Sequence, residues 1–346
     1  MLAIKKAAWK VRAEHLADAI PKSRLHPSVV NWMDNTAAGS TWAVGFSGGA
    51  DSLALLLILW AHWPARREKL VALHFNHRLR GSAANRDEHF CRTVAQALGV
   101  RWRAAKWVKA PSDPSESEAR AARHAFFERE LRRLRTKILF FGHQQDDVAE
   151  TMFMRLARGS GTGGLAAPRP IQLVGAKRVH LRPLLTLKKN EIYEHLSALK
   201  IHWREDSTNM SARFLRNRTR SQVIPAWLGA NRDRDALGGA SLSRELLEED
   251  DIALDAWLQE IDPYTKTGAL NILRLSGRPR ALVRRALRHW MTLLPDSPRL
   301  SRQGFNALLE DVMRARPTQH SFGSGGFAKL TRSRLCFEPA RRKLSN

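Results

Sequence analysis

The hexapeptide SGGADS at residues 47–52 constrains the fold most, because it joins two apolar segments of different character. Residues 41–46 before it are typical of a buried strand, and residues 53–60 after it are typical of a helix. Two adjacent glycines let the backbone approach an anion closely, and the free N–H groups at a helix start face that anion. The pattern predicts a strand, a phosphate-binding loop and a helix. A plain strand-to-helix turn is the alternative.

Asp51 adds a chemical condition to this loop, since its carboxylate would repel a phosphate unless a cation lay between them. The hydroxyls of Ser47 and Ser52 can add hydrogen bonds to the same anion. Together these residues indicate a polyphosphate that carries a metal ion.

The chain is strongly basic, because 58 Lys and Arg residues against 33 Asp and Glu residues give a net charge of +25. Residues 230–346 contain 20 basic and 14 acidic residues, so about +19 of this charge lies in the first 229 residues. Such a field attracts polyanions. We therefore expect the part that holds SGGADS to contact a nucleic acid. A basic protein without such a partner is the alternative.

The two cysteines, Cys91 and Cys336, are far apart and form no CxxC pattern, so they support neither a disulfide framework nor a zinc or iron–sulfur site. A reducing cytoplasm is the expected location. Residues 1–20 lack a continuous apolar core, and we expect a surface helix there rather than a signal peptide. No apolar stretch is long enough to span a bilayer, so we expect no membrane partner.

Segments of strand length alternate with helical segments along the first part of the chain. The expected strands are 41–46, 70–75, 100–108, 137–141 and 179–185, and the expected helices between and after them are 53–60, 88–98, 119–135, 148–158 and 188–199. This alternation predicts an α/β fold with a doubly wound parallel sheet, whose ligands bind beyond the carboxyl ends of the strands. Polar clusters follow these strands and should meet at one rim.

We expect two domains. Residues 1–229 should form the ATP-binding catalytic domain, with residues 1–35 as a helical extension, and residues 230–346 should form a smaller, mainly helical domain. The helices expected there are 243–260, 280–294 and 302–314, followed by a hairpin within 321–337.

Five further blocks, in order up to residue 220, resemble the tRNA(Ile)-lysidine synthetase family of the PP-loop ATP pyrophosphatase superfamily. SGGADS itself is shared with the whole superfamily. The family-like blocks are LHFNHRLRGSAANRDE, SESEARAARHAFF, GHQQDDVAETMFMRLARGSGTGGL, LRPLL and EDSTNMSARFLRNRTR. The resemblance covers about half of the chain and implies an adenine nucleotide alpha hydrolase-like sheet.

The resemblance implies a ligase that uses ATP and Mg²⁺ to join free L-lysine to C2 of the wobble cytidine, position 34, of tRNA(Ile) with a CAU anticodon. ATP adenylates the base, pyrophosphate and AMP are released, and the tRNA then reads AUA in place of AUG. We expect no obligate protein partner. A PP-loop tRNA 2-thiolation enzyme is the alternative, but such chemistry generally needs a reactive cysteine or a cysteine cluster.

The resemblance also implies roles for individual residues. The catalytic candidates are Asp51, Asp146 and Asp147, of which Asp51 and Asp146 would hold the metal. The candidates for ATP binding are Ser47, Gly48, Gly49, Ala50, Asp51, Ser52 and His143. The candidates for binding lysine or tRNA are Asn76, His77, Arg78, Arg80, Arg120, Arg123, Arg158, Arg182, Asp206, Asn209, Arg213, Arg216, Asn217 and Arg220.

Several of these residues have a plainer interpretation. Asp146 or Asp147 could cap a helix, Arg120 and Arg123 could be solvated surface charges, and Arg182 could make a structural pair. Asp206 and Asn209 could belong to an ordinary turn.

The chain departs from the family pattern at two positions, where Gln144 replaces a usual histidine and His124 replaces a usual tyrosine. Residues 159–164 match GxGxxG but follow a helix instead of a strand, so a dinucleotide site is not expected. We expect a flexible loop there, at the mouth of the site beside Arg158.

Overall fold

The computed structural model describes residues 2–37, 39–79, 81–108, 110–111, 113–175, 178–205, 214–295 and 300–340. Four predicted site residues, Arg80, Asp206, Asn209 and Arg213, lie outside the described residues. The chain divides into two compact units, Met1–Glu248 and Glu249–Asn346.

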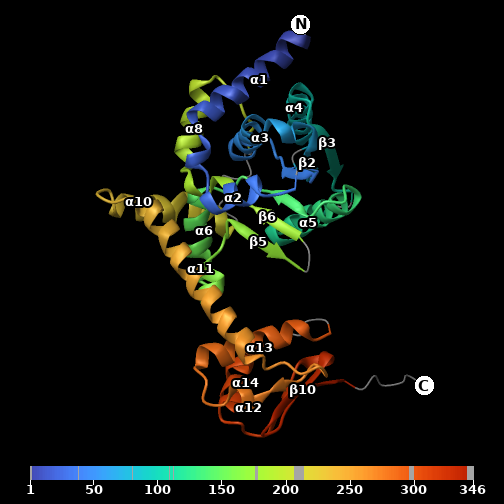
Figure 1. The fold of residues 1–346 in the computed structure, drawn as a ribbon, viewed down its shortest axis with the longest axis vertical. Helices are drawn as coiled ribbons and strands as arrows, with labels where there is room; N and C mark the ends of the chain where they lie inside the picture. Colours follow the sequence, from blue (N-terminus) through green and yellow to red (C-terminus); the bar gives the residue numbers. More distant parts are fainter. Residues whose placement is uncertain are drawn as a thin grey trace, which may run out of the picture. The chain divides into compact units, whose positions relative to one another are not determined.

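A six-stranded sheet forms the centre of the first unit (Figure 1), with the order β3-β2-β1-β4-β6-β5. The neighbours from β3 to β6 pair in parallel, and β5 pairs antiparallel with β6. The strands are β1 (Trp42–Gly45), β2 (Leu70–Asn76), β3 (Arg101–Lys106), β4 (Ile138–Phe140), β5 (Ile171–Val174) and β6 (Arg178–Leu181). The predicted α/β fold with a mostly parallel sheet is confirmed.

Helices cover both faces of this sheet. Successive side chains along a strand point to opposite faces, so alternate residues of one strand pack against different helices. Trp42 and Val44 of β1 pack into a core with the helices of one face, whereas Ala43 packs with Phe126 and Leu131 on the other. The helices of this unit are α1 (Leu2–Ala19), α2 (Pro27–Asp34), α3 (Ala50–His62), α4 (Ser82–Leu98), α5 (Glu116–Arg133), α6 (Gln145–Leu156), α7 (Thr162–Leu165), α8 (Lys189–Ala198), α9 (Leu215–Arg218), the π-helical turn η5 (Thr219–Val223), α10 (Ile224–Ala230) and the start of α11 (Ala236–Ile261).

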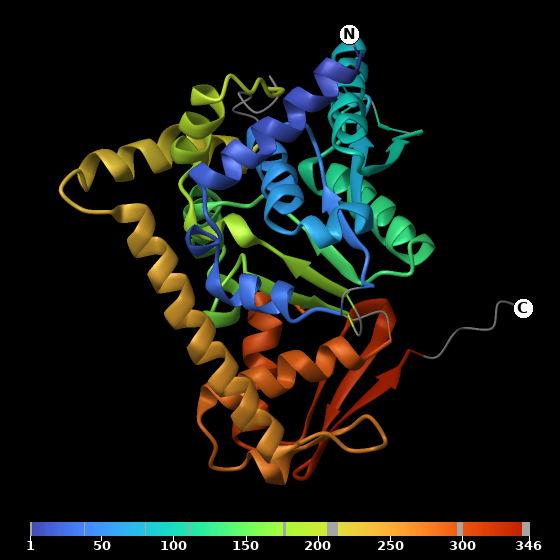
Figure 2. The ribbon, with the colours of Figure 1, turned by 45° about the horizontal axis from the view of Figure 1, so that its top comes forward.

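The N-terminal helix α1 lies across α3 and also contacts α4 (Figure 2). Leu16 and Ile20 at its end are fully buried in the core of that face, so the predicted helical extension is part of the packed unit. No helix among the described residues is long and apolar enough to cross a membrane.

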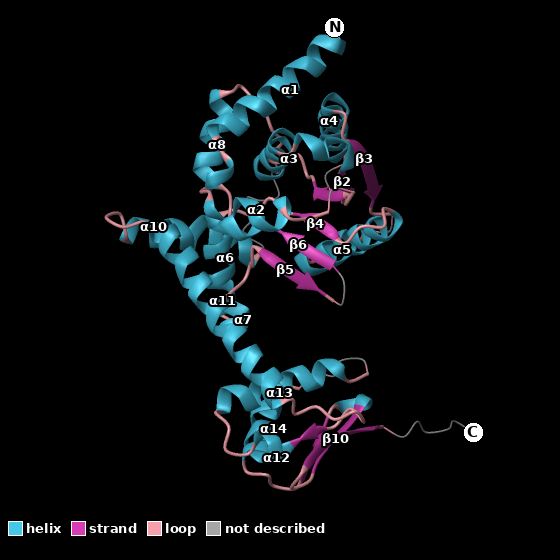
Figure 3. Cartoon of the chain, viewed as in Figure 1, coloured by secondary structure: helices cyan, strands magenta, loops and turns pink. Residues whose placement is uncertain are grey.

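The second unit has its own core and contains more strand than the predicted hairpin. Its sheet has the order β7-β10-β9-β8, and Figure 3 shows it as strands beside helices. Leu270, Trp290 and Leu335 are fully buried in its centre. Its elements after α11 are β7 (Leu270–Asn271), α12 (Ile272–Leu275), α13 (Arg280–Leu293), α14 (Arg302–Met313), β8 (Thr318–Ser321), β9 (Gly326–Leu330) and β10 (Arg334–Pro339).

The structural division at Glu248 lies beyond the expected domain boundary after residue 229. The physical reason is an apolar contact, since Ile224 of α10 and Leu237 of α11 are buried together with Ala149 of α6. The first half of α11 therefore belongs to the unit that holds the parallel sheet.

Candidate functional site

The loop after β1 needs glycine at its centre. Gly48 has φ +92°, a conformation that residues with a side chain rarely adopt. A Cβ added to Gly48 would lie 2.8 Å from Cys91 Sγ. Cys91 belongs to α4, which packs against this loop. Both the backbone conformation and the space below it therefore require glycine.

The two serine hydroxyls hold the loop in shape. Ser47 Oγ lies 3.0 Å from Ser52 Oγ, and Ser52 Oγ donates a hydrogen bond of 3.1 Å to the Gly49 carbonyl. Gly49 is the N-cap of α3 and supplies no side-chain cap, so the first N–H groups of the helix remain available to an anion. The predicted strand, loop and helix are present, and their geometry suits a phosphate.

The segment after β4 lies directly against this loop, because Gly142 touches the first turn of α3. A Cβ added to Gly142 would lie 2.7 Å from the Asp51 carbonyl oxygen and 3.0 Å from the Ser52 nitrogen. The fold thus brings the GHQQDD block and the phosphate loop together, as the convergence at one rim predicted.

Replacing Gly142 with alanine should therefore weaken binding of ATP more than tenfold, because both contacts involve backbone that cannot turn away. The measurement is ATP affinity by calorimetry, with the Tm as a check on folding. Gly229→Ala is the matched control, since a Cβ there meets nothing within 4 Å. Equal affinities for the two variants would contradict this reading of the contact.

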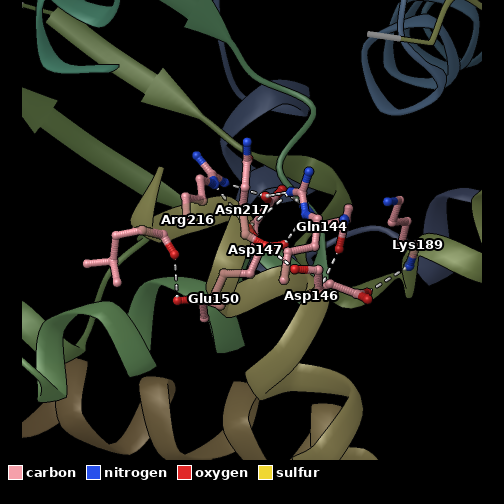
Figure 4. A network of polar contacts seen from close by, with 11 residues as sticks. Gln144, Asp146, Asp147, Glu150, Lys189, Arg216 and Asn217 are labelled. Carbon is pink, nitrogen blue, oxygen red and sulfur yellow. Dashed lines mark hydrogen bonds and ion pairs between the residues drawn. The ribbon is translucent and has the colours of Figure 1, made fainter. Parts of the chain in front are cut away.

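The start of α6 is a capping box, so the capping interpretation is confirmed for Asp147. Gln144 Oε1 accepts a hydrogen bond of 2.6 Å from the Asp146 nitrogen, and Asp147 Oδ2 accepts one of 3.1 Å from the Gln144 nitrogen. The residue that departs from the family pattern thus serves as the N-cap. Asp146 is turned toward α8, where its Oδ2 accepts a hydrogen bond of 2.9 Å from the Lys189 nitrogen (Figure 4).

Two buried acids of α6 pair with two arginines from the 215–220 segment, of which Figure 4 labels Arg216. Arg216 donates to Asp147 Oδ1 at 2.6 Å and to Glu150 Oε2 at 3.0 Å. Arg220 donates to Glu150 Oε1 at 2.5 Å and to Glu150 Oε2 at 3.0 Å. We call Asp147, Glu150, Arg216 and Arg220 the buried ion network. Asn217 lies between the arginines in α9, where its carbonyl accepts from Ser221 Oγ at 2.9 Å.

Asp51 is the acid whose environment most favours a cation. Burial and the nearby Asp147 raise the pKa of Asp51 to about 7, with a smaller contribution from Asp146 in the same direction. Its Oδ1 is buried and has no hydrogen-bond partner among the described residues. Those residues contain no cluster of three or more metal-ligating side chains. Mg²⁺ at phosphate sites commonly takes one or two carboxylates plus phosphate and water, so the unpartnered Oδ1 of Asp51 fits such an ion.

His143 is held neutral and oriented by Arg182. Arg182 Nε donates to His143 Nδ1 at 3.0 Å, and the other nitrogens of Arg182 donate to the Arg169 carbonyl at 2.6 Å and to Gln172 Oε1 at 2.9 Å. Burial lowers the pKa of His143 to about 3, with help from Arg182. His143 Nε2 therefore carries the proton and can donate to a ligand. The contacts of Arg182 support the structural interpretation of that residue.

Arg120 and Arg123 lie one turn apart on α5, and both are close to Arg216. Arg123 Nε is buried without a hydrogen-bond partner among the described residues. Burial, Arg120 and Arg216 together lower the pKa of Arg123 to about 10. An anion beside these side chains would relieve their mutual repulsion, which favours phosphate binding over the surface-charge interpretation.

The cluster after β2 has a structural component. Asn76 is buried, donates to Glu88 Oε2 at 2.9 Å and accepts from the Arg78 nitrogen at 2.9 Å. His77 packs edge-on against Phe75 at 4.8 Å, and Arg78 is exposed with φ +58°. Asn76 thus fixes the turn, while Arg78 is left at the surface.

The GxGxxG segment is not a loop throughout, which corrects the expectation. Residues 162–165 form the short helix α7, and Arg155 of α6 donates to the Gly164 carbonyl. The match to a dinucleotide motif fails, as expected, and Arg158 beside it is exposed.

Sequence reasoning missed several residues that hold the site together. Arg204 forms an ion pair of 2.6 Å with Asp87 of α4, and its backbone nitrogen donates to the Gly48 carbonyl at 2.9 Å. Arg204 therefore connects the phosphate loop to α4. Glu150 was missed too, although its spacing of three from Asp147 places both acids on one face of α6.

Comparisons with known proteins show which family the sequence matches. A family model described as a PP-loop domain matches residues 21–227. The chain is 38% identical over 315 residues to a tRNA(Ile)-lysidine synthase of Pseudomonas syringae pv. tomato, covering 85% of this chain and 66% of that protein. It is 34% identical to a synthase of the same name from Geobacter sulfurreducens, covering 81% and 61%. The chain thus spans about two thirds or less of the length of these relatives.

Among solved structures, a U34-tRNA thiolase from Methanococcus maripaludis aligns with a TM-score of 0.49 and 17% identity, covering 69% of this chain and 78% of that one. This likeness is too low to support a statement about function.

Proposed function

The chain belongs to the PP-loop domain family, and on that basis we propose that it is an ATP-dependent ligase that joins L-lysine to C2 of the wobble cytidine of a tRNA(Ile) with a CAU anticodon. The observation that carries the proposal is the contact between the phosphate loop and the GHQQDD segment through Gly142. It brings the helix start that suits a phosphate next to carboxylates and a neutral histidine. The similarity to two lysidine synthases supports the choice of substrate.

The first step is adenylation of the base. The C2 carbonyl oxygen of the cytidine attacks the α-phosphorus of ATP, the bond to the β-phosphate breaks, and pyrophosphate leaves. The backbone N–H groups at the start of α3 would bind the phosphates, and His143 Nε2–H is suited to donate to one of them. Mg²⁺ held by Asp51 and Asp146 would neutralise charge on the departing pyrophosphate.

The second step is attack by the lysine amine. The ε-nitrogen bonds to C2, AMP leaves with the shared oxygen, and one proton must go to a base, because a free lysine ammonium has a pKa of about 10.4. Arg216 beside Asp147 keeps the pKa of that carboxyl low. Asp147 is already paired with Arg216 in the buried ion network, so we propose Asp146, which lies outside that network, as the acceptor of the proton. The metal and proton roles of Asp146 belong to different steps.

The tRNA contacts are proposed from charge and position. Arg120 and Arg123 would face a phosphate of the RNA or of ATP, and Arg78 and Arg158 are exposed where the backbone of the RNA can reach them. We propose that the second unit contacts the tRNA as well, and that the protein acts in the cytoplasm. A 2-thiolation activity has little support, since Cys91 is buried and Cys336 lies in the other unit.

The direct test supplies purified protein with ATP, Mg²⁺, labelled lysine and unmodified tRNA(Ile) that carries a CAU anticodon. We expect label to enter the tRNA with release of AMP and pyrophosphate. A methionine tRNA with the same anticodon should stay unlabelled. Label from another amino acid, or conversion of ATP to ADP, would show that the proposed reaction is wrong.

A further inference from the structure

An open pocket lies at one edge of the parallel sheet, where β3 ends beside α5, and no step of the proposed reaction uses it. Its volume is about 330 Å³, which is within the range of ligand pockets. Trp107 directly follows β3, and its backbone nitrogen donates to the Asn76 carbonyl at 2.9 Å. The pocket is therefore attached to the same end of β2 that carries Asn76 and His77.

Aromatic rings and small side chains shape this pocket. The rings of Phe75 and Phe126 lie 5.6 Å apart at an angle of 29°, and the ring of Trp107 lies 6.5 Å from that of Phe75. Trp107 is half-buried, so part of its ring can accept a ligand. Ala122 and Ala125 of α5 complete the wall and leave room for a flat group.

Positive charge flanks the rings on both sides. Lys106 lies 3.7 Å from Glu88, but Arg92 shares that carboxylate at 3.1 Å. Arg129 lies 3.4 Å from Glu130, which also pairs with Arg133 at 3.0 Å. Glu88 thus faces two cations, and so does Glu130. Among the described residues of these two groups, each group carries one positive charge more than its acid balances. A small apolar ligand would gain nothing from this arrangement, whereas a base with its adjoining phosphates would match it.

We propose that this pocket binds an unstacked base of the tRNA next to the cytidine that reacts, an inference that rests on the proposed function. Neighbouring strands are about 4.8 Å apart, so β3 lies about 10 Å from β1 and its phosphate loop. α5 supplies the wall of the pocket from one face, and Arg120 and Arg123 lie on another face of the same helix. Aromatic platforms beside basic side chains are a general device for holding single-stranded bases.

The test uses an anticodon stem-loop RNA in which 2-aminopurine replaces the adenine of the CAU anticodon. Binding to the wild type should quench the fluorescence, and Trp107→Ala should remove most of this quenching. In the lysine-transfer assay, Trp107→Ala should raise the KM for tRNA about tenfold with kcat and the KM for ATP unchanged. Ala125→Leu, which fills the pocket, should act in the same direction. Leu173→Ala, at an exposed apolar position on the opposite edge strand β5, is the control.

Three outcomes separate this inference from the proposed function. If the wild type transfers lysine while Trp107→Ala and Ala125→Leu keep the KM for tRNA and the quenching, the pocket does not hold a base. If quenching depends on Trp107 but no lysine is transferred, the pocket stands and the proposed reaction fails. An equal rise in KM for Leu173→Ala would overturn the inference, because the effect would not be specific to the pocket.

Discussion

Replacing Asp51 with asparagine is expected to lower the rate of lysine transfer about a thousandfold while binding of tRNA is retained. Asparagine preserves the shape of the side chain but removes the charge that would hold a cation beside the phosphates. The same substitution should stabilise the ligand-free protein. The folded-state pKa of Asp51 is raised from 3.8 to about 7, so the wild type loses stability as the pH rises through that range.

Two measurements check this expectation. Transfer of labelled lysine and retention of tRNA on a filter give the catalytic part, with Asp18→Ala at an exposed position of α1 as the control. Thermal unfolding without nucleotide or metal gives the other part: the Tm of Asp51→Asn should exceed that of the wild type at about pH 8, and the difference should nearly vanish at about pH 4. A variant that keeps its transfer activity would remove Asp51 from the catalytic site.

The sequence predicted the parallel sheet well, because β1, β2 and β4 are short buried segments that glycine or polar residues follow within two positions. It also predicted that the polar clusters meet at one rim, since parallel strands bring their carboxyl ends together. β5 was missed because Ile171–Val174 is a short edge strand that is partly exposed and pairs antiparallel, so it lacks the signature of a buried strand. Its pairing with β6 depends on tertiary position.

The arginine-rich segment has structural partners that local reasoning could not find, while its predicted role in binding lysine or tRNA stays a prediction. Arg216 and Arg220 were predicted to bind lysine or tRNA, because a dense basic strip is typical of a surface that meets a polyanion. In the structure they contact Glu150, which lies 66 and 70 residues away in the sequence. An ion pair between residues so far apart produces no periodic pattern in the local sequence. Arg123, which looks the same in the sequence, has a buried Nε without a hydrogen-bond partner among the described residues and remains an anion-binding candidate together with Arg120.

The sequence likewise predicted the conformation of only some glycines correctly. The pattern around Gly48 predicted a tight loop, and its positive φ agrees. The four glycines of residues 159–164 suggested a flexible loop, yet two of them lie inside α7. Helix propensity disfavours glycine, and here hydrogen bonds such as that from Arg155 to the Gly164 carbonyl override it.

The second large effect is expected from Glu150→Gln, which should destabilise the first unit by about 3–5 kcal/mol. Glu150 is almost fully buried and accepts three hydrogen bonds from Arg216 and Arg220. Asp147 and Glu150 together balance the charges of the two arginines, so neutralising one acid leaves one buried guanidinium charge uncompensated. Glu191→Gln is the matched control, because Glu191 also pairs with an arginine at 2.6 Å but the side chain of Arg24 is half-exposed, and such pairs contribute about 1 kcal/mol or less.

The part of the chain that loses stability in Glu150→Gln shows whether the buried ion network supports the site locally or the whole fold. Hydrogen exchange should accelerate first in residues 214–223, which the two arginines attach to α6, before the amides of the central strands are affected. The double variant Glu150→Met/Arg220→Met should recover part of the stability, since an apolar pair leaves no buried charge unpaired. It should not recover lysine transfer if Arg220 also contacts substrate, whereas full recovery of both would make Arg220 a purely structural residue. Equal losses for Glu150→Gln and Glu191→Gln would instead mean that the buried ion network is no stronger than a surface pair.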